Sequence, residues 1–299
     1  MSEVLVVGEA LVDVVLSGGR RTVHPGGSPL NVAVGLARLG VEVELLTRIG
    51  DDDNGSVVRR HLRDNAVPLA DGSLVDAPTA VAEASLGTDG SASYRFDIEW
   101  DLPARPLPSA LRALHAGSIS AFLEPGASKV RRLLAAASRA GAVTTFDPNI
   151  RPALVGDRAI GRAATEAIAR LVDVVKLSDE DARWLYPDAT ADDVLARLRA
   201  LGPRVAVMTK GAGGAVLASA VGSVAVPAAR VEVIDTIGAG DAYMSSLIAA
   251  LVAGFPTDLA ALEALGRRCA TAAAITVSRA GAQPPTGQDV AVALAAIGR

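Results

Sequence analysis

The stretch DTIGAGDAYMSSL, residues 235–247, places glycines and aspartates directly before an apolar run that predicts a helix. Gly238, Ala239 and Gly240 would lie at the N-terminus of that helix, where free N–H groups and the helix dipole bind anions and glycine admits a phosphate to the backbone. Asp241 would follow in the first turn. It could simply complement the dipole, or it could accept an alcohol proton while the N–H groups hold a transferring phosphoryl. The spacing alone leaves both interpretations open.

Four other polar clusters follow runs that predict buried strands: GEALVD, FDPNIRP, KLSDED and MTKGAGG. Turns everywhere use such residues. In an open parallel sheet, however, ligands bind beyond the carboxyl ends of the strands. Four clusters at the same end of one sheet therefore indicate a site there.

The elements that would position these clusters alternate between strands and helices, which predicts a parallel sheet. A strand at 3–10 precedes a helix in which Ser28 is the expected N-cap, Pro29 the first helical residue and Gly40 the end. A single strand is expected at 41–50. Two alternating runs at 79–98, around the turn GTDGS, predict a hairpin inserted into one domain that spans residues 1–299.

Composition excludes several classes of function. The chain has 299 residues, of which half are hydrophobic, and a formal net charge of −4 without a basic stripe, so neither nucleic acid nor an anionic membrane is an expected partner. A single cysteine, Cys269, excludes an internal disulfide framework. The N-terminal stretch lacks a basic segment, and no uncharged run reaches the ~18 residues of a membrane span. We expect a cytoplasmic protein.

Other phosphate-binding motifs fit poorly. The G-x-x-x-x-G-K-[ST] pattern of a P-loop does not occur, and no complete G-x-G-x-x-G follows the first strand. The missing glycine fingerprint disfavours a dinucleotide-dependent oxidoreductase.

The stretch 235–247 resembles the C-terminal signature of the ribokinase-like, or PfkB, carbohydrate kinases, and GGSPLNVAVGLARLG (26–40) resembles their N-terminal signature. Five further motifs occur in the family's order: GEALVDV (8–14), FDPNIRP (146–152), KLSDEDARWL (176–185), VMTKGAGGA (207–215) and AITVSRAGAQPPT (274–286). The resemblance implies a three-layer α/β/α ribokinase-like fold with a mostly parallel central sheet. It also implies a small β-sheet lid over the sugar, formed by a hairpin and one short strand within about 13–25 and 78–102.

By this resemblance Asp241 is the general base and the backbone of 238–240 forms the anion hole. Asp13, Gly27 and Asn31 match positions that bind sugar hydroxyls, although Asn31 could instead bond its own helix backbone. Arg151 could reach a phosphate or anchor its loop. The implied nucleotide-binding residues are Lys176, Ser178, Thr209, Gly211, Gly214, Gly238 and Gly240.

Magnesium is expected with ATP, because the phosphates need charge neutralisation during transfer. The family often carries an Asn-x-x-Glu motif that organises the Mg²⁺ shell, and Ser178 and Asp181 occupy the matching positions. Asp181 is one methylene shorter than glutamate, so Glu180 could substitute, in either case through water. A monovalent cation such as K⁺ could bind near Asp235 and Ile237.

The motifs GEALVDV and FDPNIRP resemble those of fructokinases and 2-keto-3-deoxygluconate kinases more than those of adenosine kinases. We therefore expect an ATP-dependent sugar kinase, with fructose or a related sugar as acceptor and a homodimer formed through the lid. A nucleoside kinase of the same family and a non-catalytic regulator that binds sugar or nucleotide are the alternatives. The intact Asp241 and its glycines argue against the regulator.

Overall fold

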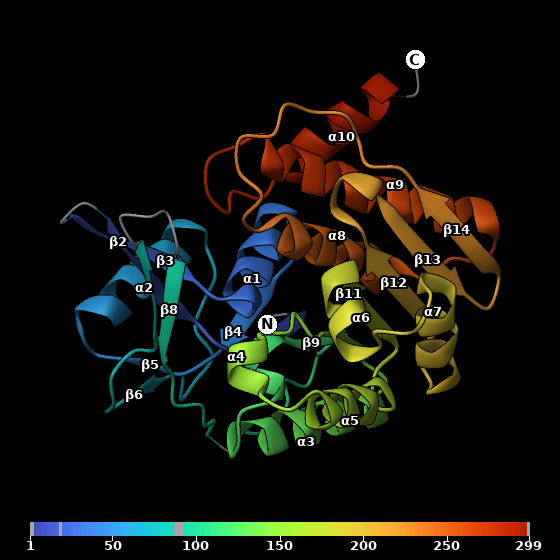
Figure 1. Ribbon diagram of the computed structural model, residues 1–299. Coiled ribbons are helices and arrows are strands. Elements are labelled where there is room, and N and C mark those ends of the chain that lie inside the picture. The colour runs from blue at the N-terminus through green and yellow to red at the C-terminus, as the bar shows by residue number, and fades with distance from the viewer. Residues whose placement is uncertain (1–2, 18–19, 87–91, 104, 298–299) are drawn as a thin grey trace.

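The computed structural model describes residues 3–17, 20–86, 92–103 and 105–297. An eight-stranded sheet runs through the centre in the order β14-β13-β12-β11-β10-β9-β1-β4, parallel from β12 to β4 and antiparallel at β13 and β14 (Figure 1). Its strands are β1 (Val4–Val7), β4 (Val43–Leu46), β9 (Ala113–Gly117), β10 (Val143–Asp147), β11 (Val174–Ser178), β12 (Val205–Thr209), β13 (Ala215–Ser219) and β14 (Gly222–Val226).

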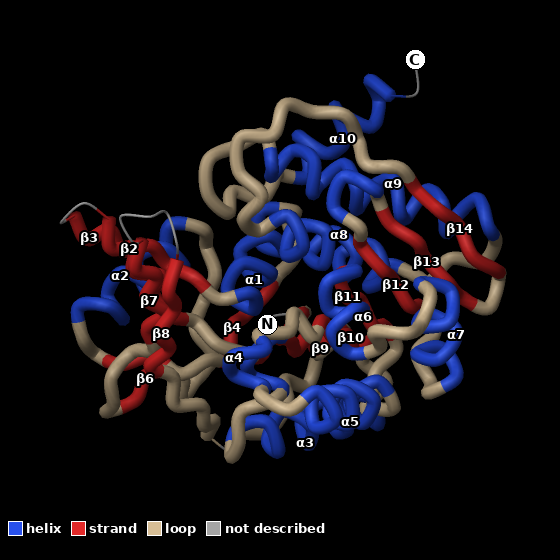
Figure 2. The backbone as a smooth tube through the Cα atoms, viewed as in Figure 1, coloured by secondary structure: helices blue, strands red, loops and turns tan. Residues whose placement is uncertain are grey.

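Helices cover both faces of this sheet, which gives three layers (Figures 1 and 2). One face carries α1 (Ser28–Arg38), α8 (Ala239–Ala253) and α9 (Leu259–Val277), with α10 (Gly287–Ile297) packed on α9. The other carries α3 (Gly126–Arg139), α5 (Arg158–Ala169), α6 (Asp179–Leu185) and α7 (Ala191–Ala200). The remaining elements are α2 (Asp53–Asp64), α4 (Pro152–Val155) and the short 3-10 helices η1 (Ser118–Ala121) and η2 (Gly211–Gly213).

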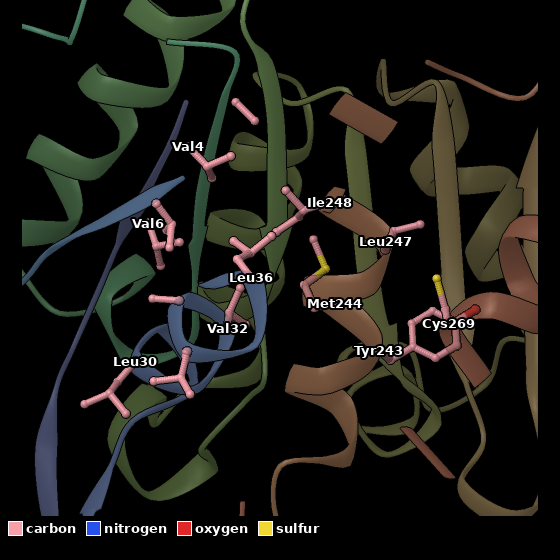
Figure 3. Packing of buried hydrophobic residues seen from close by; sticks show 14 of the residues in the cluster. Val4, Val6, Leu30, Val32, Leu36, Tyr243, Met244, Leu247, Ile248 and Cys269 are labelled. Carbon is pink, nitrogen blue, oxygen red and sulfur yellow. The ribbon is translucent and has the colours of Figure 1, made fainter. Parts of the chain in front are cut away.

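Alternation along β1 shows how sequence produces these layers. Val4 and Val6 belong to the core beneath α1 and α8, whereas Leu5 and Val7 belong to the core on the α3 side. Successive side chains of a strand point to opposite faces, so a strand covered on both faces must be apolar throughout. Figure 3 shows Leu36 of α1 with Val4 and Val6 of β1 on one side of it and Met244 of α8 on the other.

A second sheet of four strands lies apart from the main one, in the order β3-β2-β7-β8 (Figure 2). It consists of β2 (Leu11–Ser17), β3 (Arg20–Gly26), β7 (Val81–Leu86) and β8 (Ala92–Asp97), with β2 and β7 parallel and the outer pairs antiparallel. The expected hairpin corresponds to β7 and β8, and its GTDGS turn lies outside the described residues. One short strand was expected within about 13–25, and the structure instead has the antiparallel pair β2 and β3 there.

The strand expected at 41–50 is divided. After β4, the buried Thr47 leaves the main sheet: its hydroxyl accepts the Ala10 amide at 2.9 Å, and its amide donates to Ser73 Oγ at 3.1 Å. Residues 49–50 then form β5 (Ile49–Gly50), which pairs with β6 (Leu74–Val75) in a two-stranded sheet. None of the helices in the described part of the chain is both long enough and apolar enough to cross a bilayer.

Candidate active site

Asp241 lies in the first turn of α8 and is almost wholly buried, with 9% of its surface exposed. Its Oδ1 accepts a hydrogen bond from Ser28 Oγ at 2.6 Å and its Oδ2 accepts one from Asn31 Nδ2 at 2.8 Å. Burial raises the pKa of this carboxyl, while Ser28, Asn31, Lys176 and Arg151 oppose the rise. A raised pKa makes a carboxylate a better proton acceptor.

Close packing of α1 against α8 brings these groups together. Ser28, Asn31 and Gly35 are spaced along one face of α1, and Asp241 and Ser245 along one face of α8. A side chain at Gly35 would collide with Ser245 Oγ, so the glycine allows the two helices to approach at this point.

The prediction that Ser28 is the N-cap of the first helix is wrong. The N-cap of α1 is Gly27, with φ +110°, and Ser28 is the first helical residue. Its hydroxyl is therefore free from capping and reaches a carboxylate 213 residues away in the chain. Asn31 likewise bonds the candidate base in this structure.

The N-terminus of α8 begins at the cap residue Gly238, whose φ of +78° is left-handed. The amide of Ala239 donates to the Thr236 carbonyl at 3.3 Å. Helix geometry leaves the amides of Gly240 and Asp241 without intrahelical acceptors. A Cβ built on Gly240 would have Lys176 Nζ as its nearest neighbour, at 3.6 Å, so the lysine lies beside these amides.

Lys176 and Asp147 form a buried ion pair at 2.8 Å, with side-chain exposures of 4% and 3%. Burial lowers the pKa of Lys176, but the carboxylates of Asp147, Asp181 and Asp241 more than offset this, and the pKa is raised. Burial also raises the pKa of Asp147, to about 6, against the opposing Lys176. Asp147 Oδ1 is buried without a hydrogen-bond partner.

Asp147 lies within the motif FDPNIRP, but no role was predicted for it from the sequence. A signal was present, because β10 and β11 are neighbours and each carries one charged residue among uncharged ones. Charged side chains that are fully buried are almost always paired.

The predicted sugar-binding residues lie around the start of α1. Asp13 on β2 is exposed, and a side chain at Gly26 would collide with its carboxylate. A Cβ on Gly27 would meet the Glu9 carbonyl oxygen. Loss of solvation raises the pKa of Asp13, and the charge of Arg151 opposes this.

Arg151 is exposed and anchors its own loop: its Nη1 donates to Asn149 Oδ1 at 2.7 Å and to two backbone carbonyls. Its charge also acts on Glu9, Asp13 and Asp241, so it faces the same space. The loop-anchoring alternative is thus visible in the structure, and a phosphate role remains compatible with it.

Ser178 and Asp181 form a capping box at the start of α6. Asp181 accepts hydrogen bonds from Ile150 N, Ser178 N and Ser178 Oγ at 2.7–2.9 Å, so protein donors already occupy both oxygens. Glu180 is exposed on the helix. Within the described ranges, no cluster of three or more His, Cys, Asp or Glu side chains could hold a metal ion by itself.

Two loops complete the list of predicted residues. Thr209 ends β12, and the exposed Gly211 has open space around it. Gly214 is buried, and a Cβ there would strike the Val226 carbonyl, so packing against β14 is sufficient reason for this glycine. The Asp235 carboxylate accepts hydrogen bonds from the amides of Ile237 at 3.0 Å and Gly281 at 2.9 Å, and so connects its own loop to the loop that contains Gly281. The Ile237 side chain is exposed.

Glu9 is a buried residue of this region that sequence analysis missed. It follows β1, is 3% exposed, and accepts the Ser120 amide at 3.1 Å and a hydrogen bond from the Ser118 side chain. Burial raises its pKa to about 7 despite these donors and the charge of Arg151.

A buried carboxylate beside free helix-terminal amides and a lysine suits phosphoryl transfer to an alcohol, and it lies beyond the carboxyl ends of parallel strands. Fold and site together thus define an α/β phosphotransferase class.

Comparisons with known proteins agree. The sequence model of the pfkB family carbohydrate kinases matches residues 1–288. A fructokinase of Klebsiella pneumoniae is 37% identical over 284 residues, covering 89% of this chain and 91% of its own. The structure of a Xylella fastidiosa fructokinase with bound ATP matches with a TM-score of 0.86 at 26% identity, over 100% of both chains. That of a Vibrio cholerae fructokinase double mutant with fructose, ADP and a potassium ion matches with a TM-score of 0.82 at 26% identity, over 98% of both.

The chain belongs to the pfkB family of carbohydrate kinases. The predicted family and the predicted ribokinase-like α/β fold are confirmed, and the protein is a kinase that acts on a sugar.

Proposed function

We propose that this protein transfers the γ-phosphoryl group of ATP to a hydroxyl of fructose, with Asp241 as the general base. The observation that carries the proposal is the buried Asp241 carboxylate beside the open N-terminus of α8. Fructose and ATP are supported by the fructokinase relatives and by the neighbours bound to ATP or to fructose and ADP.

The chemistry follows from the positions of the side chains. Asp241 accepts the proton of the sugar hydroxyl while the oxygen of that hydroxyl bonds to the γ-phosphorus. The bond between the γ-phosphorus and the β–γ bridging oxygen breaks, and ADP leaves. The amides of Gly240 and Asp241 and the ammonium of Lys176 stabilise the phosphoryl oxygens as charge redistributes. Asp13, Gly27 and Asn31 would orient the sugar, and Arg151 would face the phosphoryl group or hold its loop.

The nucleotide would extend from Gly238 and Gly240 along the carboxyl ends of β11 and β12, past Lys176, Ser178, Thr209 and Gly211. This is the edge at which α/β sheets bind ligands. Gly214 would contribute only through the backbone turn that it allows.

Magnesium suits the carboxylates at this edge. Asp147 Oδ1 is a buried carboxylate oxygen without a partner, and oxygen donors of this kind are what Mg²⁺ prefers. Asp147 would hold the ion, and Asp181 or the exposed Glu180 would contribute through water. When bound, Mg²⁺ would neutralise charge on the ATP phosphates.

Two further features complete the proposal. A potassium ion would bind near Asp235 and the backbone of Ile237, as suggested by the potassium-bound neighbour. A homodimer would form through the small sheet, whose outer strands β3 and β8 each have only one neighbour in that sheet and gain from being covered. The enzyme would work in the cytoplasm, where ATP is supplied.

The test is a coupled ADP-release assay with ATP, Mg²⁺ and a panel of fructose, related sugars and adenosine. Fructose should be the preferred acceptor, and Asp241→Asn should lower kcat by about 10²- to 10⁴-fold, because proton removal contributes that much. Fructose binding, measured by calorimetry, should persist in Asp241→Asn. The exposed Asp71→Asn is the matched control. Near-normal turnover in Asp241→Asn would assign the base elsewhere, and a preference for adenosine would reassign the acceptor.

A further inference from the structure

Ser28 makes a contact that its place in the helix does not require. It is the first residue of α1, and no side chain caps that helix end. The residue is buried, with 8% of its surface exposed, and its hydroxyl donates to Asp241 Oδ1 at 2.6 Å. A hydrogen bond this short is typical of a hydroxyl and an ionised carboxylate.

We propose that Ser28 is a positioning residue for the base: its hydroxyl fixes the rotation of the Asp241 carboxylate and favours the ionised form that accepts the sugar proton. With Asn31 on Oδ2 and Ser28 on Oδ1, each oxygen is held by one donor and keeps a second lone pair for the substrate. Ser28 retains its own proton throughout. The inference rests on the proposed role of Asp241 as base.

Several charged groups face Asp241 and compete with Ser28 in setting its ionisation. Lys176 of β11 and Arg151 of the loop after β10 favour the carboxylate, whereas Asp147 of β10 is a like charge. The Ser28 hydrogen bond, at 2.6 Å, and the Asn31 hydrogen bond, at 2.8 Å, both stabilise the ionised form, as do the two cations. Removing the Ser28 hydrogen bond should therefore raise the pKa of Asp241 and leave the cations in place.

The experiment measures the pH dependence of kcat/KM for fructose in the full chain. In Ser28→Ala the acid limb of the profile should move to higher pH by about one to two units, since a hydrogen bond to a charged group is worth roughly that shift. Ser28→Thr retains the hydroxyl and should keep the wild-type limb. Ser246→Ala removes another fully buried serine hydroxyl, five residues after Asp241 on α8, and should also leave the limb unchanged.

A folded fraction that stays constant over the pH range scales the whole profile and leaves the position of its acid limb unchanged. An acid limb in Ser28→Ala that coincides with the wild type, or one that moves equally in Ser28→Thr or Ser246→Ala, would overturn the inference. Asp241→Asn separates this outcome from failure of the proposed function. If that variant keeps its rate, the base is wrong; if it is inactive while Ser28→Ala is unshifted, only the role of Ser28 is wrong.

Discussion

The buried Glu9 predicts that the stability of this enzyme depends on pH in a way that one substitution removes. Glu9 is 3% exposed, and burial raises its pKa from 4.5 to about 7. Between these two values the folded protein binds more protons at this site than the unfolded chain does. The contribution of Glu9 to stability is therefore fully present below pH 4.5 and is lost as the pH rises through 7.

The size of the effect follows from the shift. A rise from 4.5 to about 7 corresponds to about 3 kcal/mol in total, of which about 2.5 kcal/mol is lost between pH 5 and pH 8. Glu9→Gln cannot ionise, so its stability should lack this component. Any hydrogen bonds to Ser118 and Ser120 that glutamine makes less well should add an offset that does not vary with pH.

Urea unfolding of the wild type and Glu9→Gln at several pH values between 5 and 8 tests this. The wild-type free energy of unfolding minus that of the variant should fall by about 2.5 kcal/mol over the range. Glu232→Gln, at an exposed position, controls for removal of a surface charge. A difference that stays constant with pH, or that increases, would refute the reasoning from burial.

Two further predictions concern the proposed phosphate-binding end of the site. In Gly238→Ala the new Cβ would lie 2.7 Å from that of Ala282 at a φ of +78°, so kcat should fall and stability should drop by about 1–3 kcal/mol, measured by assay and urea unfolding. Gly141→Ala is the control: its φ is +81° and the added Cβ would have open space around it. It should lower stability only through the unfavourable backbone conformation and should leave kcat unchanged. Lys176→Met should raise the KM for ATP about tenfold. The variant should also be less stable than the wild type, and by more at pH 8 than at pH 5, because protonation at low pH neutralises the Asp147 carboxylate that has lost its partner. An unchanged KM for ATP would place the phosphates away from Lys176.

Local sequence was sufficient to predict the features that depend on neighbouring residues. The helix after Gly238, the glycine turn and the acid at 241 all depend on residues within one helical turn, and the structure has them there. The parallel sheet follows from apolar runs that alternate with amphipathic ones, as β1 illustrates. Because parallel strands end at the same edge, the location of the site could also be predicted.

Features that depend on packing could not be predicted in this way. The pattern around Ser28 fits an N-cap, and only the approach of α1 to α8 at Gly35 turns its hydroxyl to Asp241. The break in the strand at Thr47 depends on partners 37 and 26 residues away. Glu9 gave no local signal of burial, because its donors lie on η1, more than a hundred residues further along the chain.

Under the proposed function, the balance of charge at the site gives a physical reason for using amides as well as cations. Lys176 faces the carboxylates of Asp147, Asp181 and Asp241, and Arg151 faces that of Asp241. Lys176 is already paired with Asp147, so the protein has little positive charge to spare for a triphosphate. Helix-terminal N–H groups attract phosphate without adding a cation that would lower the pKa of the base. In the proposed mechanism a divalent cation bound with ATP would supply the remaining charge, and Asp241 would remain able to accept a proton.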